Sequence, residues 1–341
     1  MPCYCSIIPP YVLRSILEKG NPRQQEAAWS TLTDTEQFRG RRKILTALTP
    51  IIATAPGRKR RTIYDARHVY DLPGRLVRSE GSPKSKDITV NEAYDGSGAT
   101  YDFYSRIFDR NSIDGFGMRL DTTVHYGKNY DNAFWDGRQI VCGDGDGILF
   151  GRFTKSLDVI AHELTHGVMQ FEANLHYRGQ PGALNESFSD VFGILARQYR
   201  RRETAEESDW LIGKELFVKG VQALALRSMK APGTAYDDPV LGKDPQPDHM
   251  RGYVTTSDDN GGVHINSGIP NRAFYELSVR LGGFAWEKAG RIWYKTLTEK
   301  LRPNSTFRDA MNLTMMAAQE LFGLNGTEHK AAREAWAEVG L

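Results

Sequence analysis

The chain has 341 residues, with 44 basic and 42 acidic side chains and a formal net charge of +2. Hydrophobic residues make up 40% and charged residues 25%, as expected for a globular protein large enough for two substantial lobes. The balanced charge argues against nucleic acid or a membrane surface as a partner, and no apolar run is long enough to span a bilayer.

Residues 1–50 differ in character from the rest of the chain. Their pattern predicts short helices at 11–18 and 24–40, separated by an Asn-Pro pair. The first residues lack a basic start and two prolines interrupt their apolar run, so they do not read as a secretory signal. The three cysteines are too few for a disulfide framework, and Cys142 is expected to be a small buried hydrophobe in a strand.

Two basic clusters, at 39–43 and 58–61, flank an apolar linker. Such charge runs are usually solvated surface, but here they also frame an exposed apolar segment.

Residues 62–153 alternate short strand patterns with Gly, Asp and Asn turns, which predicts a mainly β lobe with one helix at 101–108. His68 and His125 have no partner in the sequence and are expected to be structural. From residue 154 the pattern becomes helical. Helices are predicted at 209–225, 268–281, 284–300, 305–323 and 327–338, with a long loop at 231–250.

The stretch VIAHELTHGVMQ, residues 159–170, carries the strongest chemical signal. His162 and His166 are four residues apart and share a helix face, with Glu163 beside the first. This HExxH pattern is typical of catalytic zinc sites, in which three protein ligands leave a fourth position for water.

The third ligand can be sought at two spacings. A downstream HxxGxxH continuation fails, because Met169 and Glu172 stand where its glycine and histidine belong. A second amphipathic helix, GALNESFSDVFG, instead offers Glu186, with Asp190 four residues further along the same face.

HELTH, GALNESFSD, DNGGVHINSG and NAFWDG together resemble the thermolysin family of neutral zinc endopeptidases, over nearly all of the chain from about residue 60. Residues 1–50, with IIPPY, resemble the short propeptide of the protealysin branch. The resemblance implies an α+β two-lobe zincin. It divides the chain into a propeptide (1–50), a mainly β catalytic lobe ending in the zinc helix (51–170) and an α-helical lobe (171–341).

The resemblance implies a zinc-dependent endopeptidase that is made as a zymogen and cuts on the amino side of large hydrophobic residues. Its roles for particular residues are as follows. One catalytic Zn²⁺ is held by His162, His166 and Glu186, and Glu163 is the general base acting on zinc-bound water. Tyr177 and His264 stabilise the oxyanion, and Asp259 orients His264. Asp190 and Asn185 orient the ligand histidines.

Substrate is expected to bind as an added strand, with its side chain after the cut bond in an apolar pocket. The backbone is assigned to Asn132, Ala133, Trp135 and Arg227, and the pocket to Phe150, Phe153, Val159, Ile212 and Leu226. The family's paired calcium site is altered, because Arg197, Leu211 and Lys214 accompany Asp158 and Asp209. Two basic side chains argue against calcium there, and salt bridges are expected instead.

The propeptide is expected to act as an intramolecular inhibitor of a monomeric enzyme. The apolar linker after it suits cleavage by the enzyme itself, and we predict this maturation within 41–60, before one of the apolar residues Ile44, Leu45, Leu48, Ile51 or Ile52. A further hypothesis is that Cys3 or Cys5 reaches the open zinc position as a thiolate. The resemblance implies an extracellular enzyme exported without a classical signal, and a cytoplasmic pool is equally compatible.

Two alternatives stay open at this point. A zinc aminopeptidase would share the ligands, but its GxMEN-type sequence is absent from this chain. A catalytically inactive zincin that serves as a binding module would have lost Glu163, Tyr177 or His264, and all three are present.

Overall fold

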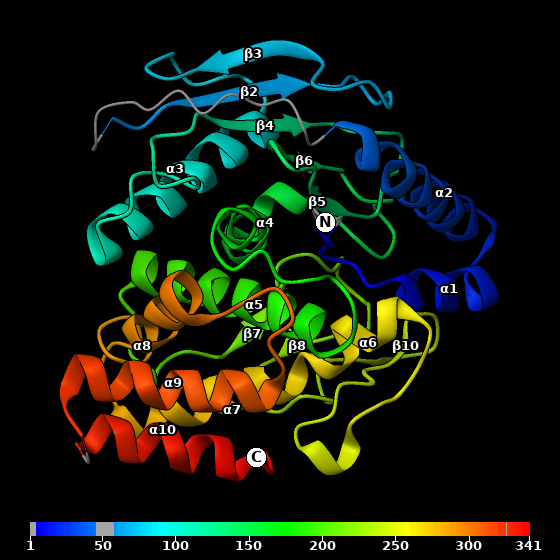
Figure 1. The fold of residues 1–341 in the computed structure, drawn as a ribbon. Coiled ribbons are helices and arrows are strands. Elements are labelled where there is room, and N and C mark those ends of the chain that lie inside the picture. Colours follow the sequence, from blue (N-terminus) through cyan, green and yellow to red (C-terminus); the bar gives the residue numbers. More distant parts are fainter. Residues whose placement is uncertain (1–4, 46–57, 325) are drawn as a thin grey trace.

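The computed structural model describes residues 5–45, 58–324 and 326–341, with the backbone alone for 36–45. Cys3 and the predicted cleavage bonds before Leu48, Ile51 and Ile52 lie outside the described residues. Figure 1 shows a β-sheet on one side of helix α4 (Leu157–Phe171) and a helical layer on the other. The zinc helix of the prediction therefore lies between a mainly β part and an α-helical part.

A six-stranded sheet runs in the order β1-β5-β6-β4-β2-β3. β2, β4 and β6 are parallel neighbours, and the other pairings are antiparallel. The strands of this sheet are β1 (Cys5–Ser6), β2 (Arg61–Asp65), β3 (Arg75–Ser79), β4 (Leu120–Val124), β5 (Ala133–Trp135) and β6 (Gln139–Cys142). Two small hairpins lie further along the chain, formed by β7 (Leu211–Ile212) with β8 (Arg227–Ser228) and by β9 (Asp237–Asp238) with β10 (Gly242–Lys243).

The helices agree in most places with the sequence pattern. The predicted propeptide helices are present and longer than expected, and 268–281 and 327–338 are helical over the predicted ranges. The helices besides α4 are α1 (Pro10–Lys19), α2 (Pro22–Leu45), α3 (Ile88–Phe108), α5 (Gly179–Arg201), α6 (Asp259–Asn266), α7 (Gly268–Leu281), α8 (Ala289–Lys295), α9 (Phe307–Phe322) and α10 (Thr327–Glu338), with short 3₁₀ turns at Phe153–Lys155 and Met250–Gly252 and a π-helical turn at Thr296–Lys300.

Helix α3 begins thirteen residues before the predicted 101–108 segment. Gly96 and Gly98 weaken the helical pattern, since glycine is an unfavourable helix residue. In the folded chain both are required by close packing. A Cβ at Gly96 would lie 2.4 Å from Ile160 Cδ1, and one at Gly98 would lie 2.3 Å from the Arg61 guanidinium. Tertiary packing therefore outweighs local propensity along this helix.

The prediction of a helix at 209–225 is wrong. The segment instead contains β7, turns and the approach to β8, and Trp210 and Gly213 have φ values of +57° and +67°, which no α-helix allows. Long-range hydrogen bonds hold this backbone in place. The Gly213 N–H donates to Asp158, and the Leu211 carbonyl accepts from Arg197.

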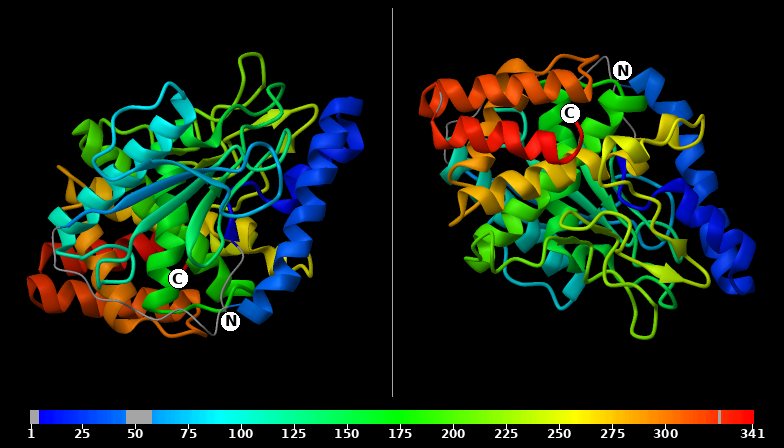
Figure 2. Two further views of the ribbon diagram at one scale, coloured as in Figure 1. Left: turned by 90° about the horizontal axis from the view of Figure 1, so that it is seen from above. Right: turned by 90° about the horizontal axis from the view of Figure 1, so that it is seen from below.

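The amino-terminal segment packs into the body rather than beside it. Both views in Figure 2 show α2 running along one side of the molecule. Ile7, Ile8, Val12, Leu13 and Ile16 are at most 1% exposed and belong to the main hydrophobic cluster. The segment therefore shares its core with the part of the chain that carries the HExxH helix.

Candidate metal centre and substrate cleft

The three predicted metal ligands converge between α4 and α5. Nε2 of His162 lies 2.9 Å from Nε2 of His166. Glu186 Oε2 lies 3.5 Å from His162 Nε2, and Glu186 Oε1 lies 3.6 Å from His166 Nε2. Donors bound at ~2.0 Å in a tetrahedron stand ~3.3 Å apart. The separations therefore fit three ligands of one zinc ion with a free corner.

The hydrogen bonds around the two imidazoles support this fit. Asp190 Oδ1 lies 2.9 Å from His162 Nδ1, and Asn185 Oδ1 lies 2.8 Å from His166 Nδ1. Both oxygens are acceptors, so each Nδ1 carries a proton and each Nε2 presents its lone pair to the other. Among the described residues, Glu186 Oε2 is buried without a hydrogen-bond partner. A cation at this point satisfies all three donor atoms.

A close contact between helices sets the spacing of the ligands. A Cβ on Gly193 of α5 would lie 2.6 Å from the Asp158 carbonyl oxygen of α4. Only glycine lets the two helices approach this closely, and their approach brings Glu186 to the two histidines.

Glu163 lies beside the ligand set and is fully buried. Its Oε2 accepts a hydrogen bond of 2.8 Å from the Trp135 N–H, and its Oε1 is buried without a hydrogen-bond partner among the described residues. Burial raises the pKa of this carboxyl well above its usual range. A carboxylate in such a setting readily accepts a proton.

Tyr177 and His264 both lie next to the Glu186 carboxylate. The Tyr177 hydroxyl donates to Glu186 and lies 3.2 Å from His264 Nε2. Asp259 Oδ1 lies 2.6 Å from His264 Nδ1. Burial alone would lower the pKa of His264, but Asp259 and Glu186 outweigh it and raise this pKa. The imidazole is therefore suited to donate from Nε2.

The amino-terminal segment occupies the edge at which substrate was expected to bind. Strand β1 pairs antiparallel with β5, with Cys5 opposite Trp135. The Ile7 N–H donates to the Ala133 carbonyl at 3.1 Å. The Ile8 N–H donates to Asn132 Oδ1 at 2.9 Å, and Asn132 Nδ2 donates back to the Ile8 carbonyl at 3.3 Å. Three of the residues predicted to bind substrate backbone thus bind the chain's own amino terminus.

The carbonyl groups of this segment meet the predicted oxyanion side. His264 Nε2 lies 3.0 Å from the Ser6 carbonyl oxygen, and Arg227 Nη1 donates to the Ile7 carbonyl at 3.1 Å. The five predicted pocket residues are buried in the same apolar cluster as Ile7 and Ile8; they are Phe150, Phe153, Val159, Ile212 and Leu226.

Arg227 is tied to the predicted ligand His162 through Asp190. The Asp190 carboxylate accepts two bonds of 2.8 Å from Arg227 and one of 2.9 Å from Asn271. Burial alone would raise the pKa of Asp190, but Arg227 outweighs it and lowers this pKa to about 2. Ser189 Oγ also lies 3.0 Å from His166 Nδ1. The sequence reasoning missed Ser189 and Asn271, although Ser189 lies one helical turn after Asn185.

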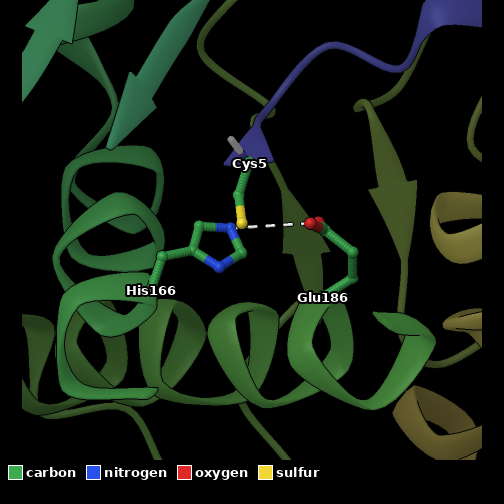
Figure 3. A group of neighbouring side chains, drawn as sticks. All are labelled: Cys5, His166 and Glu186. Atoms are coloured by element: carbon green, nitrogen blue, oxygen red, sulfur yellow. Dashed lines mark ion pairs between the residues drawn. The ribbon is translucent and has the colours of Figure 1, made fainter. Parts of the chain in front are cut away.

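Cys5 lies beside two of the predicted ligands, His166 and Glu186. Its sulfur and donor atoms of His166 and Glu186 all lie within 4.8 Å of one another (Figure 3). Cys5 is disulfide-bonded in this structure, so its sulfur is not a thiolate. Cys142, in contrast, is free and buried in β6, as expected.

Ion pairs occupy the position where the resemblance places calcium. Arg197 Nη1 lies 3.1 Å from Asp158 Oδ2, and its Nη2 pairs with Asp209 Oδ1. Lys214 Nζ lies 3.0 Å from Asp209 Oδ2. The expected salt bridges are therefore present.

Comparison with known proteins bears on the whole chain. Residues 54–170 match the family described as thermolysin metallopeptidase, catalytic domain, and residues 173–341 match its alpha-helical domain. An extracellular metalloprotease of Pectobacterium carotovorum subsp. carotovorum is 51% identical, over 99% of this chain and 96% of that protein. Protease PrtS of Photorhabdus sp. (strain Az29) is 46% identical over 99% of this chain and 92% of that protein.

A solved structure, the precursor of protealysin, a metalloproteinase from Serratia proteamaculans, superposes with a TM-score of 0.91. It is 49% identical and covers 98% of this chain and 99% of that chain. Among the described helices, none is both long and apolar enough to cross a membrane.

Proposed function

Because this chain belongs to the thermolysin family of metallopeptidases, in its protealysin-like branch, we propose a residue-level mechanism for its established class of activity. The protein is a neutral metalloendopeptidase made as a zymogen. The observation that carries the mechanism is the convergence of His162, His166 and Glu186 within 3.6 Å of one another beside Glu163. The aminopeptidase and inactive-zincin alternatives have no support.

We assign one zinc ion to His162, His166 and Glu186. Bound there, zinc supplies a Lewis acid that polarises a peptide carbonyl and makes water more acidic. The Asp190 and Asn185 acceptors hold both imidazoles with their Nε2 lone pairs toward the ion.

Glu163 is the general base in this proposal. It takes a proton from the attacking water and passes it to the departing amine nitrogen. The unpartnered Oε1 supports this role, because it is free to accept a proton while Oε2 is held by the Trp135 N–H.

Tyr177 and His264 are proposed to donate to the oxyanion of the tetrahedral intermediate. The contact of His264 Nε2 with the Ser6 carbonyl supports this role, because that carbonyl stands in for a substrate carbonyl. Asp259 positions His264 through the bond to Nδ1.

Substrate is proposed to replace residues 5–8 along β5. Asn132, Ala133 and Trp135 would then hold its backbone, and Arg227 would donate to one of its carbonyls, as these residues now do for the amino-terminal segment. The apolar lining of Phe150, Phe153, Val159, Ile212 and Leu226 supports cleavage before Leu, Phe and similar residues.

We further propose that residues 1–50 inhibit the enzyme by holding this edge, and that the catalytic and helical lobes divide near residue 170. Cys5 contributes by covering the metal centre. A thiolate contact would require reduction of its disulfide. If the double variant with Cys3→Ser and Cys5→Ser stays as inactive as the parent precursor, this contribution of the cysteines is excluded.

We propose that no calcium binds where the resemblance places the family's paired calcium site. The ion pairs of Arg197 and Lys214 with Asp158 and Asp209 support this proposal. A monomer without nucleic-acid or membrane partners stays a prediction. Two relatives are named as extracellular, and we propose the same location here, with a cytoplasmic pool as a further prediction.

The test uses matured enzyme and a library of amino-terminally blocked peptides, with and without a zinc chelator. We expect cleavage before large apolar residues, loss of cleavage with chelator and its return with zinc. The Glu163→Gln variant should bind zinc but cut nothing. Cleavage by that variant would exclude Glu163 as the base, and cleavage confined to free amino termini would restore the aminopeptidase alternative.

A further inference from the structure

A second group of metal-ligating side chains lies outside the proposed catalytic site. His68, His125 and Asp144 each offer a ligand atom, and these atoms lie within 4.8 Å of one another. His68 and His125 were expected to be structural residues without partners. The fold instead gives both histidines a shared partner in Asp144.

The topology of the sheet explains the convergence. β2, β4 and β6 are parallel neighbours in register, with Asp65 opposite Val124 and Thr123 opposite Val141. Their carboxyl ends therefore meet at one edge of the sheet, where ligand sites often form in parallel sheets. His68 follows β2, His125 follows β4 and Asp144 follows β6.

The distances between the donor atoms suit one ion. Asp144 Oδ2 lies 2.7 Å from His125 Nδ1 and 3.5 Å from His68 Nδ1. Ligands bound at ~2.0 Å in a tetrahedron stand ~3.3 Å apart, so a small movement of Asp144 admits a metal ion. Asp144 Oδ1 is buried without a hydrogen-bond partner among the described residues, which leaves a second lone-pair oxygen at the site.

The surroundings of His125 match those of a metal ligand. Its other nitrogen, Nε2, lies 2.8 Å from Asp87 Oδ2. Ligating histidines usually donate their second N–H to such a carboxylate, which fixes the ring and the tautomer. Asp87 is itself fixed, because it caps helix α3 by accepting from the Thr89 N–H.

The backbone holds both imidazoles in place, and solvent can reach the site. The His68 N–H donates to the His125 carbonyl at 2.8 Å. Both residues have positive φ, +61° and +55°, a conformation that is uncommon outside glycine and that often marks functional positions. The His68 side chain is 56% exposed and the His125 side chain 15% exposed, so an ion can enter beside His68.

We propose that His68, His125 and Asp144 bind one divalent transition-metal ion, separate from the catalytic zinc. Two imidazoles and one carboxylate form a ligand set that suits Zn²⁺, Co²⁺, Ni²⁺ or Cu²⁺ rather than Ca²⁺ or Mg²⁺. The ion replaces the proton between His125 Nδ1 and Asp144 Oδ2, and this proton leaves to solvent. Water completes the coordination on the exposed side.

The site would join the ends of three strands close to the docked amino-terminal segment. The Tyr70 hydroxyl, two residues after His68, forms a hydrogen bond of 2.5 Å with the Ser30 hydroxyl of α2. The Tyr126 hydroxyl, next to His125, donates a hydrogen bond of 3.1 Å to the Asp34 carboxylate of α2. An ion bound here therefore stiffens the two loops that hold α2.

The test uses the full-length Glu163→Gln precursor, which cannot process itself under the proposed mechanism. The protein is first loaded with one equivalent of Zn²⁺ and then titrated with Co²⁺, and bound metal is measured by mass spectrometry under native conditions. We expect two ions per chain. A single ion in excess Co²⁺ overturns the proposal.

Variants in the same background identify the second site. His68→Ala and Asp144→Asn should each lose the second ion, whereas His329→Ala, on α10, should keep both. Asp87→Asn should keep the stoichiometry and weaken the second affinity about 10- to 100-fold. Retention of the second ion by His68→Ala and Asp144→Asn, with unchanged affinity, places it elsewhere and refutes the assignment.

Discussion

Replacing Arg197 by alanine removes the guanidinium group from the position where the family resemblance places a calcium site. The Arg197 and Asp158 side chains are only 4% and 1% exposed, so the substitution leaves a buried carboxylate without its counter-ion. Removing one partner of a buried pair costs about 3 to 5 kcal/mol. Asp158 keeps hydrogen bonds from the Val159 and Gly213 N–H groups, which places the expected loss near the lower limit, at about 3 kcal/mol.

For a chain of 341 residues, a loss of this size lowers the melting temperature by ~4 °C. Thermal and denaturant unfolding of the Glu163→Gln precursor, followed by circular dichroism, measures both quantities. Arg201→Ala is the matched control, because Arg201 lies on the same helix and pairs with Glu215 at 2.8 Å, with both side chains exposed. It should change stability by less than ~1 kcal/mol.

A loss for Arg197→Ala that equals the loss for Arg201→Ala would refute the reasoning. Added Ca²⁺ should leave the melting temperature of the parent protein unchanged. A rise on adding Ca²⁺ to the parent would show that the ion pairs have not replaced a calcium site.

Three further outcomes are expected. Asn185→Ala should weaken zinc binding about tenfold in competition with a chelator, because His166 Nδ1 loses its amide acceptor and keeps only the Ser189 hydroxyl; unchanged affinity would exclude this role. Chelation should stop self-processing of the precursor, and zinc should restore it; processing that persists without metal would point to another protease. Burial alone would raise the pKa of Asp209, but Arg197 and Lys214 outweigh it and hold this pKa below its usual value. The charged Asp209 carboxylate therefore stabilises the folded protein above pH ~4, and this stabilisation is lost as pH falls through the folded pKa. In the Asp209→Asn variant, the denaturation midpoint should fall less steeply with decreasing pH than in the parent protein. The same dependence on pH in both proteins would contradict the assignment.

The convergence of the four side chains proposed for the metal site could be predicted because its signals are local. His162, Glu163 and His166 lie within one helical turn, and Glu186 is marked by its own amphipathic helix. The family resemblance supplied the residues that lie far apart in the sequence, such as Tyr177 and His264.

Contacts between distant segments could not be predicted in the same way. His264 and the Ser6 carbonyl are 258 residues apart, and no periodicity connects them. His68, His125 and Asp144 follow three separate strands, so their proximity depends on strand order and parallel register. These properties follow from the packing of the sheet rather than from any single segment.

If substrate binds along β5 as proposed, the pairing of β1 with β5 makes the amino-terminal segment and a peptide substrate mutually exclusive ligands of one sheet edge. While the linker is intact, the segment competes at the high effective concentration of a tethered group. Once the linker is cut, the segment becomes an ordinary dissociable competitor. Under this proposal, dilution and proteolysis of the released piece determine how much enzyme is active, so the cut itself is only the first step of activation.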